Sequence, residues 1–211
     1  MRILVTGGAG FIGYHLIKRL KQSGHEVFAF DDFSTGDNKV EGQEYQKYCV
    51  YADREWWSEY YKDIIVIYHL AAVSRIQPSF TDPWRTSKIN IMGTQAVLEY
   101  AKRHGCNVMY PASSSKYGGE LLSPYAWSKL QGENLCRLYN QTYGVDIAIP
   151  RFYNVYGPKQ PQEGPFATVL GIFEKQYSEG KPLTIEGSGD QRRDFTHVED
   201  VAEAITLIGE L

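Results

Sequence analysis

The sequence has few cysteines, no long hydrophobic run and no concentration of positive charge, and each of these absences excludes a class of protein. Only 3 cysteines occur in 211 residues, and their spacing is not that of metal ligands. We therefore predict that Cys49, Cys106 and Cys136 are free, buried thiols in a reducing compartment, and that the protein holds no metal. No segment approaches the roughly 18 apolar residues of a membrane span, and because Met1 to Val5 resemble a strand and not the apolar region of a leader, we expect no secretory leader. These absences favour a cytoplasmic protein without membrane contact.

The distribution of charge argues against nucleic acid as a partner. The formal net charge is −3, and the densest basic spot, Arg192 and Arg193, is flanked by Asp190 and Asp194. A protein that follows a phosphate backbone needs a basic stripe, which this sequence does not have. Small anionic ligands are still compatible with the sequence, because one or two well-placed arginines suffice to bind them.

Short β-branched runs alternate with longer amphipathic segments as far as Pro150. We expect strands at 3–6, 26–30, 64–70, 108–110 and 145–150, and helices at 11–23, 86–104 and 124–143. Such alternation is typical of parallel strands joined by crossover helices, so it predicts an α/β fold with a Rossmann-type, doubly wound parallel sheet. Beyond Pro150 the sequence becomes rich in Gly and Pro, and we expect a helix-and-loop region around 166–180 at the carboxyl edge of the sheet.

Three glycines follow the first expected strand, where the first helix begins. Gly7 permits a tight turn, Gly10 lets a pyrophosphate approach the backbone, and Gly13 lets the helix pack closely on the sheet. The helix N-terminus adds free N–H groups and a partial positive charge for phosphates. Asp31 follows Gly13 by 18 residues, where a carboxylate binds the adenosine ribose hydroxyls, which favours NAD over NADP. The alternative is a structural turn with a capping aspartate.

Tyr125 and Lys129 are four residues apart on an expected helix, so their side chains emerge on one face. A nearby ammonium and the positive nicotinamide ring would lower the pKa of the tyrosine from its usual ~10, so that it can take a hydroxyl proton. The pair alone is common on amphipathic helices. It gains weight because the expected strand at 108–110 leads into serines 113–115 at the edge where α/β folds bind ligands. A serine-rich turn without a function is the alternative.

Several further motifs follow one another in order. They are Thr6 to Gly13, His69-Leu70-Ala71-Ala72, Asn90 with Gly93-Thr94, Tyr117-Gly118, Ser123 to Lys129, Arg151 to Gly157 and Gln191 to His197. Together they resemble the extended short-chain dehydrogenase/reductases, and more narrowly the nucleotide-sugar epimerase/dehydratase family typified by UDP-glucose 4-epimerase. The resemblance runs from residue 1 to about 208. It implies an enzyme with Ser113, Tyr125 and Lys129 as catalytic residues and NAD as cofactor.

The resemblance also implies contacts with two ligands. For NAD the implied residues are Gly7, Gly10, Phe11, Ile12, Gly13, Asp31, Asp32, Asp53, Leu70, Ala71, Ala72, Asn90, Tyr125, Lys129 and Phe152. Among them, Asp53 would lie near the adenine, and Asn90 would also support the active-site helix. For the nucleotide sugar the implied residues are Ser114, Asn154 and Arg193. An ion pair of Arg193 with a neighbouring aspartate is the alternative.

The sequence departs from the family pattern at two points. Ser113 and Tyr125 are only 12 positions apart, about half the separation usual in the family, so we expect a more open cleft. Family members continue with a C-terminal lobe, whereas this sequence stops at Leu211; it is either a short member or a fragment. We therefore divide it into an NAD-binding domain at 1–150 and a reduced substrate-binding region at 151–211 that is not an independent domain. A homodimer through helices 86–104 and 124–143 is implied by the family.

The residues after Ser113 bear on the type of reaction. Sugar dehydratases of the family place an acid pair directly after the catalytic serine or threonine, whereas Ser114 and Ser115 stand there in this chain. This favours an epimerase, in which the sugar is transiently oxidised to a keto-sugar and the hydride returns to the opposite face. Another family reaction, namely dehydrogenation, decarboxylation, dehydration or reduction, is the enzymatic alternative. A non-catalytic dinucleotide-binding module is the other.

Overall fold

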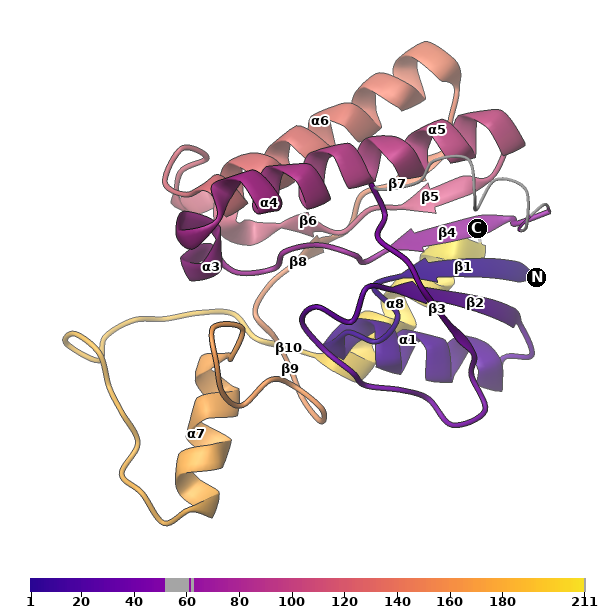
Figure 1. Ribbon diagram of the computed structural model, residues 1–211. Helices are drawn as coiled ribbons and strands as arrows, with labels where there is room; N and C mark the ends of the chain where they lie inside the picture. The colour runs from indigo at the N-terminus through magenta and orange to yellow at the C-terminus, as the bar shows by residue number, and fades with distance from the viewer. Residues whose placement is uncertain (52–60, 62, 211) are drawn as a thin grey trace.

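The structure, a computed structural model, describes residues 1–51, 61 and 63–210. Its centre is a parallel sheet of six strands (Figure 1). In spatial order they are β3 (Tyr45–Lys47), β2 (Glu26–Asp31), β1 (Arg2–Thr6), β4 (Val66–His69), β5 (Asn107–Met109) and β7 (Ile147–Ala148). The strand order changes direction at β1, which is the doubly wound arrangement. The predicted α/β fold is therefore confirmed.

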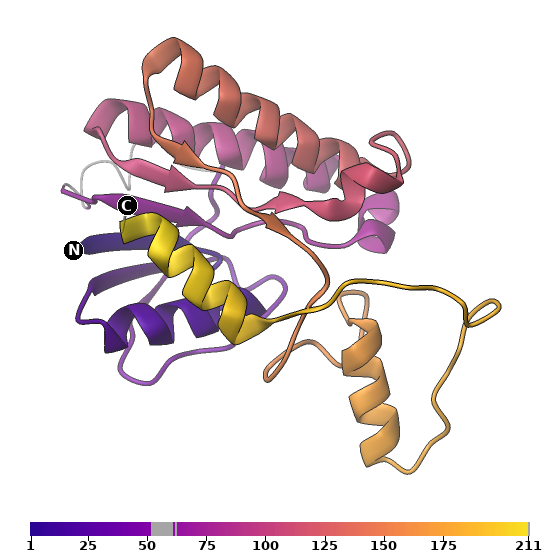
Figure 2. The same cartoon turned by 180° about the vertical axis from the view of Figure 1, so that it is seen from behind.

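Helices cover both faces of this sheet, because its strands are apolar on both sides. Along β1, Ile3 belongs to one buried cluster and Leu4 to the other. On the first face α1 (Phe11–Gln22) lies beside α8 (Val198–Glu210), and on the second α5 (Thr94–His104) lies beside α6 (Pro124–Tyr143) (Figure 1 and Figure 2). The carboxyl ends of the strands remain uncovered at one edge of the sandwich.

The helix expected over 86–104 is present, but it begins earlier and contains a π-helical segment. The chain there forms α4 (Pro83–Ser87), a π-helical segment η1 (Lys88–Gly93) and α5. The carboxylate of Asp82 accepts a hydrogen bond from the N–H of Arg85 at 2.9 Å, so the helix begins earlier than the apolar pattern predicts. A cap formed by one side chain does not change the periodicity of apolar residues, and periodicity alone therefore misses it.

Several elements are not among those predicted from the sequence. They are β3, α8, α3 (Ile76–Thr81) and two small parallel pairs, β6 (Ala112–Ser113) with β8 (Arg151–Phe152) and β9 (Val155–Tyr156) with β10 (Thr196–His197). A strand of two residues is too short to show a hydrophobic period. By contrast, α7 (Val169–Ser178) lies within the expected helix-and-loop region.

The chain beyond residue 150 has two parts of different character. α7 and the loop after it lie away from the sheet, whereas α8 returns to it (Figure 2). Val201 and Ile205 of α8 join Leu16 of α1 in one buried core. Part of the region 151–211 thus packs with the N-terminal sheet, and the division at residue 150 stays a prediction. No helix in the described part of the chain is long and apolar enough to cross a membrane.

Candidate active site

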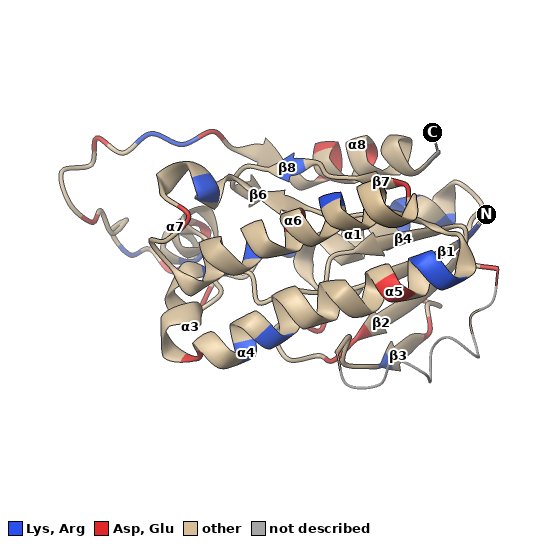
Figure 3. Ribbon diagram, turned by 90° about the horizontal axis from the view of Figure 1, so that it is seen from above, with Lys and Arg blue, Asp and Glu red and all other residues tan. Residues whose placement is uncertain are grey.

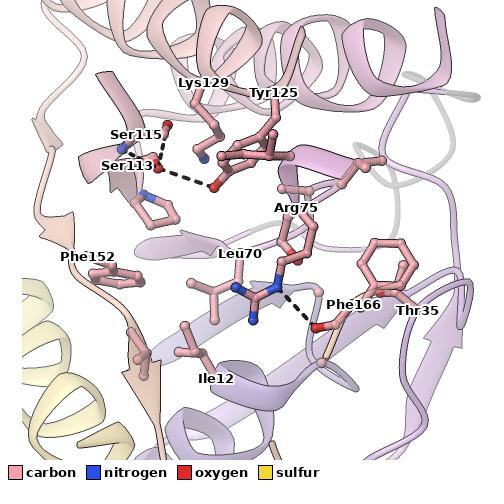
Figure 4. Close-up of a pocket in the computed structure, with 18 of the residues that line it drawn as sticks. Ile12, Thr35, Leu70, Arg75, Ser113, Ser115, Tyr125, Lys129, Phe152 and Phe166 are labelled. Carbon is pink, nitrogen blue, oxygen red and sulfur yellow. Dashed lines mark hydrogen bonds between the residues drawn. The ribbon is translucent and has the colours of Figure 1, made fainter. Parts of the chain in front are cut away.

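A cleft of about 1140 Å³ opens at the carboxyl edge of the sheet, where α/β folds place their ligand sites. One wall contains the loop after β1 and the start of α1, and the other contains the start of α6 and the segment after β6 (Figure 4). This volume exceeds the upper end of the range for ordinary small-molecule pockets. The cleft is large enough for two ligands side by side.

The glycine loop after β1 brings backbone close to backbone. Gly7 has φ +71°, and a Cβ built on it would lie 2.6 Å from the backbone nitrogen of Ala71. A Cβ on Gly13 would lie 2.2 Å from the carbonyl oxygen of Gly7. Gly10 caps α1 without a side-chain hydrogen bond, so the first N–H groups of the helix face the cleft without a capping side chain. The loop therefore has the form of a phosphate cradle.

Asp31 lies at the end of β2, on the same wall. One carboxylate oxygen accepts a hydrogen bond from Ala9 N–H at 2.9 Å and the other from Phe33 N–H at 2.8 Å. Each oxygen keeps a lone pair that can accept a ribose hydroxyl. Burial raises the pKa of Asp31, while these two backbone hydrogen bonds act to lower it. Asp32 also lines the cleft and accepts hydrogen bonds from Ser34.

The outer end of this wall includes one predicted residue that the structure does not describe. Asp53, predicted near the adenine, lies outside the described residues, and its contact with the adenine stays a prediction. Tyr48, Cys49 and Val50 line this part of the cleft. Cys106 is buried as predicted, and so is Cys136. Cys49 is not buried as predicted, because its side chain is partly exposed in the cleft. The three thiols are free.

The start of α6, which carries Tyr125, is fixed by hydrogen bonds on several sides. The hydroxyl of Ser123 caps the helix by accepting from Ala126 N–H at 3.1 Å. The backbone N–H of Tyr125 donates to the buried hydroxyl of Ser79 at 3.1 Å. Asn90, from the π-helical segment, donates to the hydroxyl of Ser128 at 2.9 Å. These contacts orient one helical turn against its neighbours.

Asn90 lies behind the wall of the cleft and is not among the residues that line it. Its amide also accepts from Val73 N–H at 2.8 Å and donates to the Val73 carbonyl at 3.1 Å. The side chain thus ties the loop after β4 to α6. This agrees with the implied support of the active-site helix, while the implied contact of Asn90 with NAD stays a prediction.

Two hydroxyls meet where β6 ends and α6 begins. Tyr125 Oη lies 3.4 Å from Ser113 Oγ, at the long end of hydrogen-bond distance. Ser113 Oγ also lies 2.9 Å from Ser115 Oγ and accepts from Ser115 N–H at 3.2 Å (Figure 4). Ser113 begins the short helix η2 (Ser114–Gly118) in this way. The structure therefore brings together Ser113 and Tyr125, two of the three implied catalytic residues, and places Ser115 beside them.

Lys129 lies one turn further along α6 and is buried. Its Nζ is 4.1 Å from the centre of the Tyr110 ring, a cation–π contact. Burial lowers the pKa of Lys129 to about 8. Burial also raises the pKa of Tyr125, while the hydrogen bond to Ser113 and the charge of Arg75 act to lower it. The lowering of the Tyr125 pKa expected from Lys129 together with a bound nicotinamide ring stays a prediction.

A buried carboxylate behind the catalytic serine was not predicted. Glu133, four residues after Lys129 on α6, is 3% exposed. It accepts a hydrogen bond from Arg151 at 2.8 Å, and Arg151 in turn donates to the Ser113 carbonyl at 2.6 Å. Arg137 also donates to Glu133, at 2.9 Å. Although burial acts to raise its pKa, these arginines lower the pKa of Glu133 to about 2.

The position of Glu133 on the buried face of α6 could have been predicted from the sequence. Glu133 and Lys129 are four residues apart, and residues four apart lie on the same face of a helix. What the sequence could not show is that Arg151 would stand opposite Glu133. That depends on the pairing of β6 with β8, which sets Ser113 beside Phe152.

The remaining predicted residues line the cleft. They are Gly7, Gly10, Phe11, Ile12, Gly13, Leu70, Ala71, Ala72, Ser114, Phe152, Asn154 and Arg193. Asn154 adopts φ +31°, a left-handed conformation that asparagine tolerates, and its amide donates to the Asp194 carbonyl at 2.8 Å. The described residues hold no ion pair between Arg193 and Asp190 or Asp194. Their contacts with substrate stay predictions.

Comparison with known proteins extends these findings. Residues 3–211 match the NAD dependent epimerase/dehydratase family. A Bacillus subtilis protein named as an uncharacterized UDP-glucose epimerase, YtcB, is 34% identical over 99% of this chain and 72% of its own length. UDP-glucuronic acid decarboxylase 1 of Xenopus tropicalis is 31% identical over 98% of this chain and 53% of its own length.

Solved structures agree with this result. The UDP-glucose 4-epimerase of Thermotoga maritima, solved with UDP-glucose, superposes with a TM-score of 0.93 at 30% identity, over 100% of this chain and 74% of that one. A variant of the UDP-glucuronic acid 4-epimerase of Bacillus cereus, solved with NAD and a fluorinated UDP-glucuronic acid, gives a TM-score of 0.87 at 34% identity, over 100% and 73%. The architecture of the chain is thus that of these epimerases.

Proposed function

Because the chain belongs to the NAD dependent epimerase/dehydratase family, we propose that it is an NAD-dependent epimerase of a nucleotide-activated sugar. The observation that carries this proposal is the meeting of Tyr125 with Ser113, with Lys129 one turn away, in the cleft that also contains the glycine loop. A hydroxyl pair beside a buried ammonium can move a proton at a sugar hydroxyl. It would do so within reach of a dinucleotide.

The residues on the other wall fit NAD. Gly7 and Gly13 have no room for a Cβ because the loop packs backbone against backbone, which fixes its shape. Gly10 carries no side chain that would keep a pyrophosphate from the start of α1, and Asp31 keeps acceptor capacity for ribose hydroxyls. A carboxylate at this place would repel the 2′-phosphate of NADP. When bound, NAD supplies reversible hydride transfer at the sugar carbon.

Each catalytic residue of this chain would act at one stated atom. Tyr125 Oη would take the proton from the sugar hydroxyl as the carbonyl forms, and return it when the carbonyl is reduced on the opposite face. Ser113 Oγ would hold the same sugar oxygen, with its backbone fixed through Arg151 and Glu133. Lys129 would supply positive charge to the tyrosinate once ligands exclude water from the cleft.

The two positions after Ser113 favour epimerisation over elimination of water, because Ser114 and Ser115 stand there and supply no carboxylate. The carboxylate of Glu133 is linked to Ser113 through Arg151, which donates hydrogen bonds to both. It is buried behind Ser113 and also accepts a hydrogen bond from Arg137. A carboxylate with a pKa of about 2 is a poor proton donor at neutral pH.

Another reaction of the family is the second candidate, since the relatives include a decarboxylase. The two are separated by the products. An epimerase converts a nucleotide sugar to an isomer of the same mass with no net NADH, whereas a dehydrogenase accumulates NADH and a decarboxylase releases CO₂. Screening UDP-, GDP-, dTDP-, ADP- and CDP-sugars for isomers by mass spectrometry and NMR tests the proposal. Purified protein that neither contains nicotinamide nor gains thermal stability from NAD would refute it.

We also propose a homodimer through the helices expected at 86–104 and 124–143, which are α4, η1, α5 and α6 in the structure. Seen from above, α5 and α6 carry mostly uncharged residues (Figure 3). Met92 of η1 and Trp127 and Leu138 of α6 expose 52%, 39% and 51% of their surfaces, and Trp127 and Leu138 line one shallow hollow. Exposed apolar side chains that gather on one face mark interaction surfaces. Light scattering of Trp127→Glu beside the wild type tests this: we expect a dimer in the wild type and a monomer in the variant.

A further inference from the structure

Arg75 is a cation in the catalytic cleft that the mechanism above does not use. It follows β4 at the N-terminus of α3 and lines the cleft together with Tyr125 and Leu70. Its Nε donates to the carbonyl of Phe166 at 3.1 Å, which joins the wall after β4 to the region beyond residue 150. Figure 4 shows the guanidinium within the cleft, between Leu70 and Phe166.

The charge of this guanidinium is not neutralised by a described acid. Within the described part of the chain, no carboxylate lies within ion-pair distance of Arg75, and its two Nη groups have no hydrogen-bond partner. The side chain is partly buried, and burial lowers its pKa. Removing a guanidinium from water without an anion is unfavourable. Its fork of N–H donors matches a carboxylate or a phosphate.

The phosphates of the two ligands already have other candidate sites. The glycine loop and the start of α1 form the cradle for the cofactor pyrophosphate. Asn154 and Arg193, at the rim, are the predicted contacts for the phosphates of the nucleotide sugar. Four cationic side chains line the described cleft, namely Arg75, Lys129, Arg192 and Arg193. Among these four, only Arg75 has both Nη groups without a hydrogen-bond partner and also a charge that acts to lower the pKa of Tyr125. The ligand group next to Tyr125 is the sugar.

We propose that Arg75 binds a carboxylate carried by the sugar, so that the favoured substrates are nucleotide-activated hexuronic acids. This inference rests on the proposed epimerase function and narrows its substrate class. The contact of Nε with the Phe166 carbonyl holds the guanidinium across the cleft, which leaves both Nη groups for a bidentate pair with the carboxylate. A neutral hydroxymethyl group at the same sugar position would leave the fork without its anion.

The test compares two substrates that differ only in this group, UDP-glucuronic acid and UDP-glucose. With the full chain loaded with NAD, we expect kcat/KM to be at least about 10-fold higher for UDP-glucuronic acid, because hydrogen bonds to a charged group are stronger. In Arg75→Gln the ratio of the two kcat/KM values should fall about 10- to 100-fold. Arg75→Lys keeps a charge but loses the fork, and an intermediate ratio is expected.

Controls make each outcome decisive. Arg103→Gln changes an exposed arginine at the end of α5 and should leave the ratio unchanged. Thermal unfolding and the amount of bound nicotinamide report whether the variants fold and retain NAD. A loss of NAD in Arg75→Gln, or an equal loss of activity on both substrates, would assign the arginine to a phosphate and overturn the proposal. An unchanged ratio would overturn it as well.

A failure of the proposed function gives a different result. If the wild type isomerises neither substrate, the epimerase function fails, and calorimetric binding then tests Arg75 separately. UDP-glucuronic acid should bind the NAD-loaded wild type at least about 10-fold more tightly than UDP-glucose, and Arg75→Gln should abolish that difference. Equal binding of the two ligands by the wild type would overturn the carboxylate assignment.

Discussion

The hydroxyl of Tyr125 lies 3.4 Å from the hydroxyl of Ser113, although the two come from different elements separated by the η2 loop. At this distance one ligand oxygen on the cleft side of the pair can lie within hydrogen-bond distance of both hydroxyls. Ser115 meanwhile lies 2.9 Å from the same serine oxygen and holds it in place. The pair is thus positioned before any ligand binds.

Replacing Ser113 by alanine should lower kcat on the nucleotide sugar by about 100-fold, as expected for loss of one acid–base partner. Bound NAD should hardly change, and thermal stability should fall only slightly: alanine removes the N-cap of the short helix η2 but leaves the backbone carbonyl that Arg151 contacts. Ser188→Ala, on an exposed loop, is the matched control. A Ser113→Ala enzyme with the kcat of the wild type would remove the serine from the mechanism.

Lys129→Met should lose activity without losing stability. The pKa of the buried ammonium is lowered from 10.5 to about 8. Between pH 8 and 10.5 the lysine is therefore mostly protonated in the unfolded chain and mostly neutral in the folded one. Because the unfolded chain binds more protons, the free energy of unfolding rises with pH over this range. Methionine removes the buried charge, and the NAD-free variant should therefore melt no lower than the wild type at pH 7. Its unfolding free energy should also lack the rise between pH 8 and 10.5, as measured by urea titrations. A variant that melts well below the wild type would contradict this.

Glu133→Gln should destabilise the fold and alter its response to acid. The drop of the Glu133 pKa from 4.5 to about 2 corresponds to roughly 3 kcal/mol of stability. Because the folded pKa lies below the usual one, this stability is present above pH 4.5 and is lost as the pH falls towards 2. The difference in free energy of unfolding between wild type and variant, measured by urea titration, should therefore become smaller as the pH falls from 4.5 to 2.

Glu41→Gln, which changes an exposed carboxylate, serves as the control for this experiment. The turnover rate shows whether Glu133 also positions the catalytic serine. Because Glu133 holds Arg151 against the Ser113 carbonyl, kcat of Glu133→Gln should fall even at temperatures where the variant is fully folded. A constant gap between pH 7 and 2 would show that the carboxylate is not held by its arginines.

Two alanine substitutions in the glycine loop should have different effects. In Gly13→Ala the new Cβ would lie 2.2 Å from a carbonyl oxygen, so the helix must move and the protein should be severely destabilised. In Gly10→Ala the nearest atom is 3.1 Å away, so the fold should survive while the methyl group enters the phosphate cradle. Calorimetry should show NAD affinity reduced about 10-fold or more in Gly10→Ala. Equal NAD affinity in Gly10→Ala and wild type would place the phosphates elsewhere.

Most of the central sheet could be predicted from the sequence, because its strands and helices have strong local signals. The boundaries of α6 are as predicted, since Ser123 and Pro124 begin it and Gly144 ends it in a left-handed conformation. The Asp31 carboxylate also lies where the spacing from the glycines places it. Such features depend on residues close in sequence.

The unpredicted features depend on contacts between distant segments. Arg75 stands in the cleft because its Nε reaches the carbonyl of Phe166, 91 positions away. The contact of Glu133 with Arg151 requires the two-residue pairing of β6 with β8. Neither leaves a periodic pattern in the chain. The charge of Arg75 could be read in the sequence, but its lack of a described acidic partner could not.

The most direct test of the proposed chemistry is the rate at which wild type and Tyr125→Phe interconvert a nucleotide sugar and its isomer. Both proteins should carry the same amount of bound NAD and have the same thermal stability, because the Tyr125 hydroxyl contacts only Ser113 among the described residues. We predict isomer formation by the wild type with no net NADH, and a kcat at least about 1000-fold lower for Tyr125→Phe. Equal rates for the two proteins would contradict the assignment of Tyr125 as the proton acceptor.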